Sequence, residues 1–154
     1  MYKGKTVSCG IIYNVKGTDK ILIGHVTLSK EWSIPKGCIE TEDDSYAITA
    51  CREFKEETNI SLKPEMIKYL GKASYRPDKD LALFYYEADE KEAKDSCFNA
   101  KCSSMFEHKY VTESGEVRFS LLPEIDRYKF VDISELDKYV NKSMVKVINQ
   151  LFRV

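Results

Sequence analysis

Residues 32–60 decide the fold of this chain, and they read Trp-Ser-Ile-Pro-Lys-Gly-Cys-Ile-Glu-Thr-Glu-Asp-Asp-Ser-Tyr-Ala-Ile-Thr-Ala-Cys-Arg-Glu-Phe-Lys-Glu-Glu-Thr-Asn-Ile. A glycine turn is followed by an acidic loop and then by helix-forming residues. The loop ends in three good N-cap residues, which are Asp43, Asp44 and Ser45. Asn59 stands where a helix favours a left-handed residue after its last turn. The stretch therefore predicts a helix over about 44–58.

Three glutamates share one side of this predicted helix. At about 100° per residue, Glu56 and Glu57 lie about 60° and 40° to either side of Glu53. The neighbouring face has the character of a core stripe, made of Ala47, Ala50, Cys51, Phe54 and Thr58. Like charges at this spacing repel each other, by a few tenths of a kcal/mol per pair. A divalent cation would turn that repulsion into a ligand set, whereas a bare Glu-x-x-Glu-Glu pattern favours a solvated acidic face.

The residues before the helix favour a phosphate site over a solvated face. Pro35 fixes its own φ angle and withholds an N–H group. Gly37 allows the chain to turn close to a ligand. Lys36, which lies between them, supplies a mobile cation suited to a phosphate group.

The same stretch resembles the signature of the Nudix hydrolases, Gly-x5-Glu-x7-Arg-Glu-U-x-Glu-Glu-x-Gly-U, in which U is a bulky aliphatic residue. The matching positions are Gly37, Arg52, Glu53, Glu56, Glu57 and Ile60. The chain departs from the signature at four points: Asp44 stands for the first Glu, one residue is inserted between Gly37 and Arg52, Phe54 fills the first U position, and Asn59 replaces the second Gly. The insertion falls in the acidic loop, where added length costs little, so the helix ligands are expected to keep their places.

The resemblance implies a hydrolase that uses Mg²⁺ or Mn²⁺ to cleave a nucleoside diphosphate linked to another group. Glu53 and Glu57 would be the main metal ligands, with the Gly37 carbonyl as a third. Glu56 would share a metal ion or take a proton from the attacking water. Arg52 would orient the glutamates through charged hydrogen bonds. Metal pairs about 3.5–4 Å apart suit in-line displacement at phosphorus.

Substrate-binding residues are expected outside the signature. Lys36 and Arg76 are the predicted phosphate contacts. Tyr75, expected just past the strand that follows the helix, is the predicted base-stacking residue. In the family, a Tyr near this position accompanies dinucleoside polyphosphates and a Pro accompanies ADP-ribose. Tyr75 and Pro77 are both present, so the substrate stays open.

The tail of the chain is similar to a branch of predicted NTP pyrophosphohydrolases. The similar segments are Phe106-Glu107, Ser114-Gly115 and Pro123-Glu124-Ile125-Asp126-Arg127, and His108-Lys109-Tyr110-Val111 replaces a Glu-Trp-Pro segment of that branch. Some relatives place a further catalytic Glu on a distal loop or strand. Glu124 is the first choice for that role and Glu107 the second, against the alternative of a surface carboxylate.

Composition limits the class of protein. The 154 residues suit one domain spanning 1–154. A net charge of −1 produces no overall field that would favour nucleic acid or a membrane. Without a signal peptide or an apolar run of about 18 residues, a soluble cytoplasmic protein is expected. Cys9, Cys38 and Cys51 are expected to be buried thiols, and Cys97 and Cys102 to lie in a loop.

Patterns of apolar residues and turns predict the remaining elements. Strands are expected at 7–14, 21–26, 32–34, 81–86, 105–111, 117–121 and 129–132, with turns at 17–19 and 114–115. Residues 87–101 are interpreted as a mobile loop or a short helix, and Ser134 as the cap of a closing helix over 134–152. Strands interrupted by a mid-chain helix predict an α/β fold with a mixed sheet. This is the α/β/α sandwich, a mixed β-sheet between helices, that the Nudix resemblance implies.

The resulting hypothesis is a Mg²⁺-dependent pyrophosphohydrolase that cleaves a phosphoanhydride bond in a nucleotide. A dinucleoside polyphosphate such as diadenosine tetraphosphate is the first choice of substrate. The alternatives are a MutT-like NTP or ADP-ribose pyrophosphatase, an RNA 5′-end pyrophosphohydrolase and a non-catalytic nucleotide-sensing module. RNA would favour a basic groove, which the near-neutral composition does not indicate. Intact Arg52, Glu53, Glu56 and Glu57 argue against the sensor.

Overall fold

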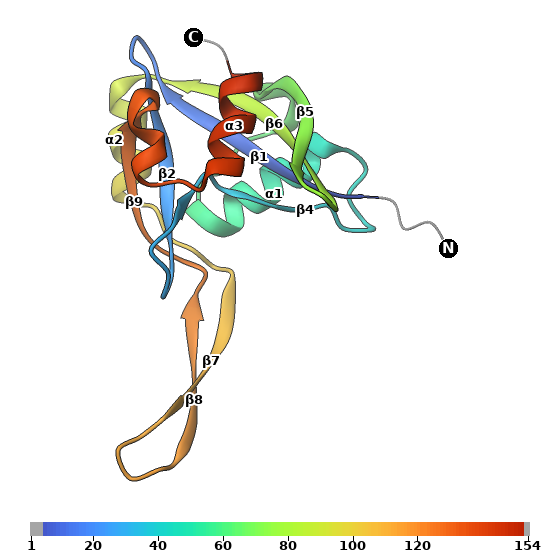
Figure 1. Cartoon of the computed structure of the whole chain (residues 1–154). Helices are drawn as coiled ribbons and strands as arrows, with labels where there is room; N and C mark the ends of the chain where they lie inside the picture. The colour runs from blue at the N-terminus through green and yellow to red at the C-terminus, as the bar shows by residue number, and fades with distance from the viewer. Residues whose placement is uncertain (1–4, 153–154) are drawn as a thin grey trace.

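The apolar run near the start of the chain forms the central strand of a mixed β-sheet (Figure 1). The structure is a computed structural model that describes residues 5–152. Strand β1 (Thr6–Val15) pairs in parallel with β6 (Lys79–Ala88) and antiparallel with β2 (Lys20–Val26) and β4 (Lys36–Cys38). Both faces of β1 are covered, which explains its nearly uninterrupted apolar sequence.

The other strands extend this sheet on both sides. Strands β3 (Trp32–Ser33) and β9 (Ile125–Asp132) pair with β2, and β5 (Lys68–Arg76) pairs with β6 at the opposite edge. The predicted mixed sheet is confirmed. Strand β4 was not expected, because three residues are too few to show a periodic pattern. Tyr75 lies within β5 rather than just past it.

Helices cover both faces of the sheet. Helices α1 (Tyr46–Thr58) and α2 (Glu90–Phe98) enclose one core, which contains Cys9, Ile11, Tyr13 and Phe54. Helix α3 (Lys142–Leu151) and the 3₁₀ helix η2 (Ile133–Lys138) enclose the other, which contains Ile12, Leu83, Leu136 and Met144. Successive residues of β1 therefore supply opposite cores, as the pleat of a strand requires. The α/β/α sandwich is confirmed.

Local signals explain the position of α1. The Ser45 hydroxyl accepts a hydrogen bond from the Ile48 N–H at 3.2 Å and so caps the first turn. Asn59 has a φ angle of 66°, and its N–H donates to the Lys55 carbonyl, which ends the helix. The predicted core stripe is confirmed, because Ala50, Cys51, Phe54 and Thr58 are buried and Ala47 is half-buried. A short 3₁₀ helix η1 (Pro64–Met66) follows.

The prediction of one closing helix capped by Ser134 is wrong. Asp132 is the cap instead, since its carboxylate accepts the Ser134 N–H at 3.0 Å and starts η2. The chain then leaves the helical path where Val140 forms a bridge to Trp32. Asn141 caps a second helix, α3, by accepting the Met144 N–H at 2.9 Å. The contact of Val140 with β3 therefore divides the predicted single helix into η2 and α3.

Strands β7 (Met105–Val111) and β8 (Val117–Pro123) form a separate hairpin, which projects from the body of the molecule (Figure 1). Both strands and the turn at Gly115, with a φ angle of 87°, agree with the prediction. The segment 87–101 contains the ordered helix α2, so the short-helix alternative is confirmed. No helix within residues 5–152 is both long enough and apolar enough to cross a membrane.

The cysteines follow the expectation only in part. Cys9 and Cys51 are buried, as predicted. Cys38 is exposed, so that expectation was wrong: the residue ends the three-residue strand β4 at the surface, next to the acidic loop. Cys97 lies in α2 rather than in a loop, and Cys102 is buried.

Candidate active site

The three glutamates of α1 differ in how far they face solvent. Glu57 is only 6% exposed, whereas the side chains of Glu53 and Glu56 are 14% and 38% exposed. The Lys36 backbone N–H lies 3.4 Å from Glu57 Oε1 and donates to it. The helix therefore does not carry a uniformly solvated acidic face, since its acidic side turns inward towards β4.

Gly37 is in direct contact with this acidic side. A Cβ atom placed on Gly37 would lie 1.9 Å from Glu53 Cδ, far inside van der Waals contact. The Glu53 carboxylate thus occupies the space that any other residue at position 37 would fill. The glycine of the signature is required here for close approach of the backbone to the carboxylate.

Arg52 connects the acidic loop to two of the glutamates. Its Nη1 atom lies 2.9 Å from Glu53 Oε1 and 3.4 Å from Glu56 Oε1. Its Nε and Nη2 atoms donate to the two carboxylate oxygens of Asp43, at 3.2 and 2.8 Å. Nη2 also donates to the Cys38 carbonyl at 3.1 Å. The guanidinium group is therefore placed as an orienting residue should be.

The acidic loop uses Asp43 rather than Asp44, which corrects the sequence alignment. Asp43 also accepts hydrogen bonds from the Glu40 N–H and the Thr49 hydroxyl, while Asp44 is exposed. Asp43 has the signature spacing when the count starts at Gly37, so the extra residue lies between Asp43 and Arg52. The Arg52 guanidinium holds the pKa of Asp43 well below its ordinary value.

We expect Asp43→Asn to lower the free energy of unfolding by about 1.5–3 kcal/mol, because it removes a hydrogen-bonded charge pair. Asp44→Asn is the matched control, and it should change stability by no more than about 0.5 kcal/mol. Urea denaturation at neutral pH measures both. Because the pKa of Asp43 is depressed in the folded state, the pair stabilises above the unfolded pKa, and its contribution is lost as the pH falls through the folded pKa. Equal effects of the two substitutions on the free energy of unfolding would show that the contact of Asp43 with Arg52 does not stabilise the fold.

The acidic side of α1 is partly buried, and burial makes negative charge there costly. Burial raises the pKa of Glu57 to about 8, and the neighbouring Glu53 carboxylate adds to the rise. Burial also raises the pKa of Glu53. Among residues 5–152, no three His, Cys, Asp or Glu side chains converge as a metal centre. A hard divalent cation nevertheless fits this donor set, because it would offset the charge that burial makes costly.

A cavity of about 330 Å³ opens beside these glutamates. It is lined by Val26, Thr27, Ser33, Ile34, Lys36, Glu57, Phe106, Glu124 and Ile125. The structure thus brings Glu124, which links β8 to β9, to the same cavity as Lys36 and Glu57. Glu107 is exposed on β7 and does not line it.

Two cavity residues were missed by the sequence analysis. The Thr27 N–H donates to the Glu124 carbonyl at 3.0 Å, and Thr27 Oγ1 is buried without a hydrogen-bond partner among residues 5–152. Phe106 enters from the base of the β7–β8 hairpin. Thr27 has no sequence signal for this role, and the tail segment that contains Phe106 resembles relatives without indicating that the fold would bring it to Glu57.

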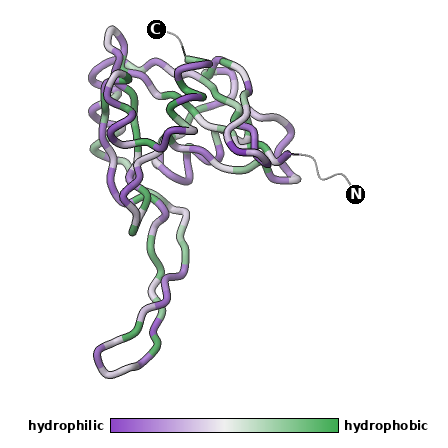
Figure 2. The backbone as a smooth tube through the Cα atoms, in the orientation of Figure 1, coloured by the Kyte–Doolittle hydropathy of each residue, from purple (hydrophilic) through white to green (hydrophobic). Residues whose placement is uncertain are grey.

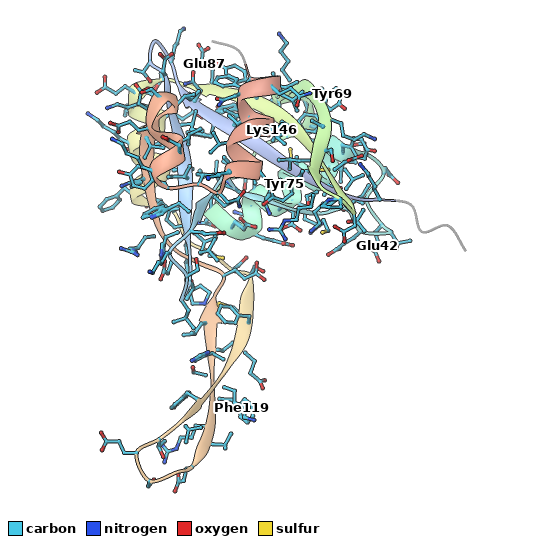
Figure 3. All side chains as sticks on the ribbon, viewed as in Figure 1. Glu42, Tyr69, Tyr75, Glu87, Phe119 and Lys146 are labelled. Atoms are coloured by element: carbon cyan, nitrogen blue, oxygen red, sulfur yellow. The ribbon has the colours of Figure 1, made fainter. Side chains whose placement is uncertain are left out.

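Tyr75 is packed more tightly than a base-stacking residue is expected to be. It is 6% exposed and belongs to the core on the α3 side (Figure 3). Its hydroxyl accepts hydrogen bonds from Asn141 at 3.2 Å and from Arg76 at 3.5 Å. The Lys36 ammonium and the Arg76 guanidinium lie 5.5 and 5.0 Å from its ring centroid. Tyr75 therefore contacts both predicted phosphate-binding cations.

Comparison with known proteins agrees with this geometry. The chain is 32% identical, over 97% of its length and 97% of the relative, to an uncharacterized 17.7 kDa protein from the e–segB intergenic region of Enterobacteria phage T4. The NUDIX domain of Shewanella oneidensis NrtR in complex with ADP ribose matches 97% of this chain and 87% of its own, with a TM-score of 0.65 and 12% identity. A C. elegans Ap4A hydrolase matches 93% of each chain, with a TM-score of 0.59 and 17% identity.

The family model for the NUDIX domain matches residues 3–151, which is nearly the whole sequence. This match covers the acidic helix, the glycine of β4 and the cavity beside them. The chain therefore belongs to the NUDIX domain family and is a Nudix hydrolase.

Proposed function

We propose that this Nudix hydrolase cleaves a phosphoanhydride bond of a dinucleoside polyphosphate, with the reacting phosphates held in the cavity beside α1. The observation that carries the proposal is the meeting of Lys36, Glu57 and Glu124 on one cavity, next to the glutamates that Arg52 connects. Cation, carboxylates and an open volume in one place are what hydrolysis of a charged phosphate chain requires. The predicted cytoplasmic location stays an expectation from the sequence.

The donor set is suited to Mg²⁺ or Mn²⁺. Glu53, Glu57 and the Gly37 carbonyl would hold the ion, and Glu56 would share it. When bound, the ion supplies charge neutralisation and alignment for in-line attack by water. Helix spacing puts Glu53 and Glu56 on the same side, and Arg52 contacts both carboxylates, at 2.9 and 3.4 Å. Their positions are thereby set before substrate arrives, which lowers the cost of binding.

The other site residues handle the substrate and the proton. Lys36 lines the cavity from β4, and we expect its ammonium to bind a phosphate oxygen. The proton of the attacking water has two acceptors within the site, Glu56 and Glu124. Glu124 lines the cavity with Glu57, and its backbone is held on both sides by Ser104 and Thr27. A carboxylate at the cavity wall whose backbone is held in place suits a general base.

Two structural relatives frame the choice of substrate. One of them was solved in complex with ADP ribose, and the other is an Ap4A hydrolase. We place the dinucleoside polyphosphate first because two cations, Lys36 and Arg76, lie against the ring of Tyr75, and a pair of cations suits a long phosphate chain. ADP-ribose and NTP remain the competing substrates, and RNA ends are not favoured.

We expect hydrolysis to require Mg²⁺ or Mn²⁺ and to stop in EDTA, because clustered carboxylates alone repel a polyphosphate. The measurement is product identification over a panel of diadenosine tetraphosphate, ATP and ADP-ribose, with each cation and without it. Full turnover of every nucleotide in metal-free buffer would overturn the mechanism. A preference for ATP or ADP-ribose would overturn the substrate assignment and leave the mechanism standing.

Tyr75→Ala should lower kcat/KM for diadenosine tetraphosphate by roughly 5- to 150-fold, the value of one stacked base at about 1–3 kcal/mol, and affect ATP less. Tyr75→Phe is the matched control, because it keeps the ring and removes the hydroxyl that Arg76 and Asn141 contact. Retention of activity in the Phe variant supports stacking. Equal losses of kcat/KM for both substrates in the Ala variant would show that Tyr75 is a packing residue, which its burial would account for.

A further inference from the structure

The two faces of the β7–β8 hairpin differ in character. Directly opposite residues in an antiparallel pair project to the same side. The register therefore defines one side, here called the arm face, which consists of Met105, Glu107, Lys109 and Val111 on β7 and Val117, Phe119, Leu121 and Pro123 on β8. The other side carries Phe106, His108, Tyr110, Arg118, Ser120 and Leu122.

The arm face exposes large apolar side chains. Leu121 and Val111 are each 64% exposed, Phe119 is 58% exposed and Val117 is 51% exposed. On the other side, Phe106, His108, Ser120 and Leu122 are half-buried, and only Tyr110 and Arg118, the pair towards the tip, are exposed. Figure 2 shows apolar segments along the projecting hairpin, and Figure 3 shows Phe119 on it, away from the body. A contiguous apolar surface of this kind marks an interaction site.

The hairpin also lacks the support that a stable ribbon needs. Strands β7 and β8 pair only with each other among the described strands. A two-stranded hairpin alone is marginally stable in water, and it gains stability when its apolar face is covered. A partner that covers the arm face would therefore stabilise the hairpin.

Charge on the hairpin indicates a protein partner. Residues 105–123 contain three acids and two bases, namely Glu107, Glu113, Glu116, Lys109 and Arg118. Glu116 pairs with Arg118 at 2.8 Å. A nucleic acid or an anionic membrane would be bound by an excess of positive charge, which this surface does not have.

The pattern on the arm face is complementary to itself. Glu107 and Lys109 lie two residues apart on β7, and Leu121 and Phe119 lie opposite them on β8. Along the hairpin, the level of the His108–Ser120 pair is midway between Glu107 and Lys109 on β7 and midway between Phe119 and Leu121 on β8. Consider a two-fold axis that lies between two facing arm faces at that level, perpendicular to the strands. It exchanges positions on either side of the level, so it brings Glu107 to Lys109 of the second copy and Phe119 to Leu121 of the second copy.

We propose that the arm face is a self-association surface, on which two copies of this chain pack hairpin to hairpin about a two-fold axis at the level of His108 and Ser120. Apolar residues of β8 cover one another, and the acid and base of β7 pair across the axis. The contact also steadies the base of the hairpin, where Phe106 and Glu124 line the catalytic cavity. This association goes beyond the hydrolase reaction and does not depend on the substrate.

Sedimentation velocity over a range of concentrations tests the proposal. The wild-type chain should reach twice its monomer mass of 17.8 kDa. Leu121→Asp should raise the dissociation constant by at least about 30-fold, as loss of a central contact residue does. Ser120→Asp is the matched control, since it places the same charge one residue away on the other face, and it should leave association unchanged. Far-UV circular dichroism verifies that both variants are folded.

A charge exchange tests the two-fold register. Glu107→Lys alone and Lys109→Glu alone each place like charges opposite one another, so each variant should be monomeric. An equimolar mixture of the two restores opposite charges at both positions and should sediment as a dimer. A wild-type chain that stays at 17.8 kDa at every concentration overturns the proposal. Equal effects of the two Asp substitutions, or a mixture that remains monomeric, also overturn it.

Discussion

Replacing Glu57 by glutamine is expected to lower kcat by at least about 10²-fold, as for loss of a main transition-state contact. The substitution keeps the size and helix propensity of the side chain and removes one ligand charge. Glu57 is the most deeply buried of the three helix glutamates and faces the cavity with Lys36 and Glu124. We therefore expect its carboxylate to contribute most of the three as a metal ligand.

The fold of the Glu57→Gln variant should remain intact. Burial raises the pKa of Glu57 to about 8, so a neutral amide suits this position in the absence of metal. The melting temperature in EDTA should be unchanged or higher, while the rise in melting temperature on adding Mg²⁺ should shrink. Glu42→Gln, an exposed change in the acidic loop, is the control and should retain both turnover and the Mg²⁺ response. Near-normal turnover by Glu57→Gln would show that Glu57 is not a metal ligand in the reaction.

Phe54→Ala should destabilise the protein by roughly 3–5 kcal/mol, the usual cost of truncating a buried aromatic residue. Phe54 is fully buried, and its ring stacks on Tyr13 with centroids 5.7 Å apart. It fixes α1 to β1, so its loss leaves a cavity between the catalytic helix and the sheet. Urea denaturation gives the free energy of unfolding.

The control for Phe54→Ala lies on the same helix. Ile48 is 37% exposed, and Ile48→Ala should change stability by no more than about 0.5 kcal/mol. Where the Phe54→Ala variant is still folded, its turnover per folded molecule should be close to that of the wild type. The reason is that Phe54 does not line the cavity. A loss of stability below about 1 kcal/mol would contradict the assignment of this face to the core.

The catalytic helix could be predicted because its signals are local. Ser45 and Asn59 end it, and the spacing of its apolar and acidic residues assigns its two faces. The acidic loop could not be read in the same way. Asp43 has the signature spacing when the count starts at Gly37, and Asp44 has it when the count runs back from Arg52. Only the folded loop places Asp43 against Arg52 and leaves Asp44 in solvent.

Distal parts of the site depended on resemblance or were not found. Glu124 was proposed from its similarity to relatives, and the structure brings it to the cavity with Glu57. Thr27 was missed because it belongs to no motif, and Phe106 was noted only as part of a tail segment similar to relatives, with no role at the site. Tyr75 was given a stacking role from its position in the sequence, but its burial depends on how α3 packs on β5.

By itself, the sequence determined the mixed α/β class, the strand-forming runs, the catalytic helix and the glutamates it carries. These features depend on residues within a few turns or strand lengths of each other, where hydrogen bonding and side-chain periodicity act directly. Tertiary structure decided the break between η2 and α3, the burial of Glu57 and the cavity shared with Glu124. It also left the β7–β8 hairpin outside the main sheet. Each of these depends on contacts between segments far apart in the chain, whose geometry exists only once the two cores are packed.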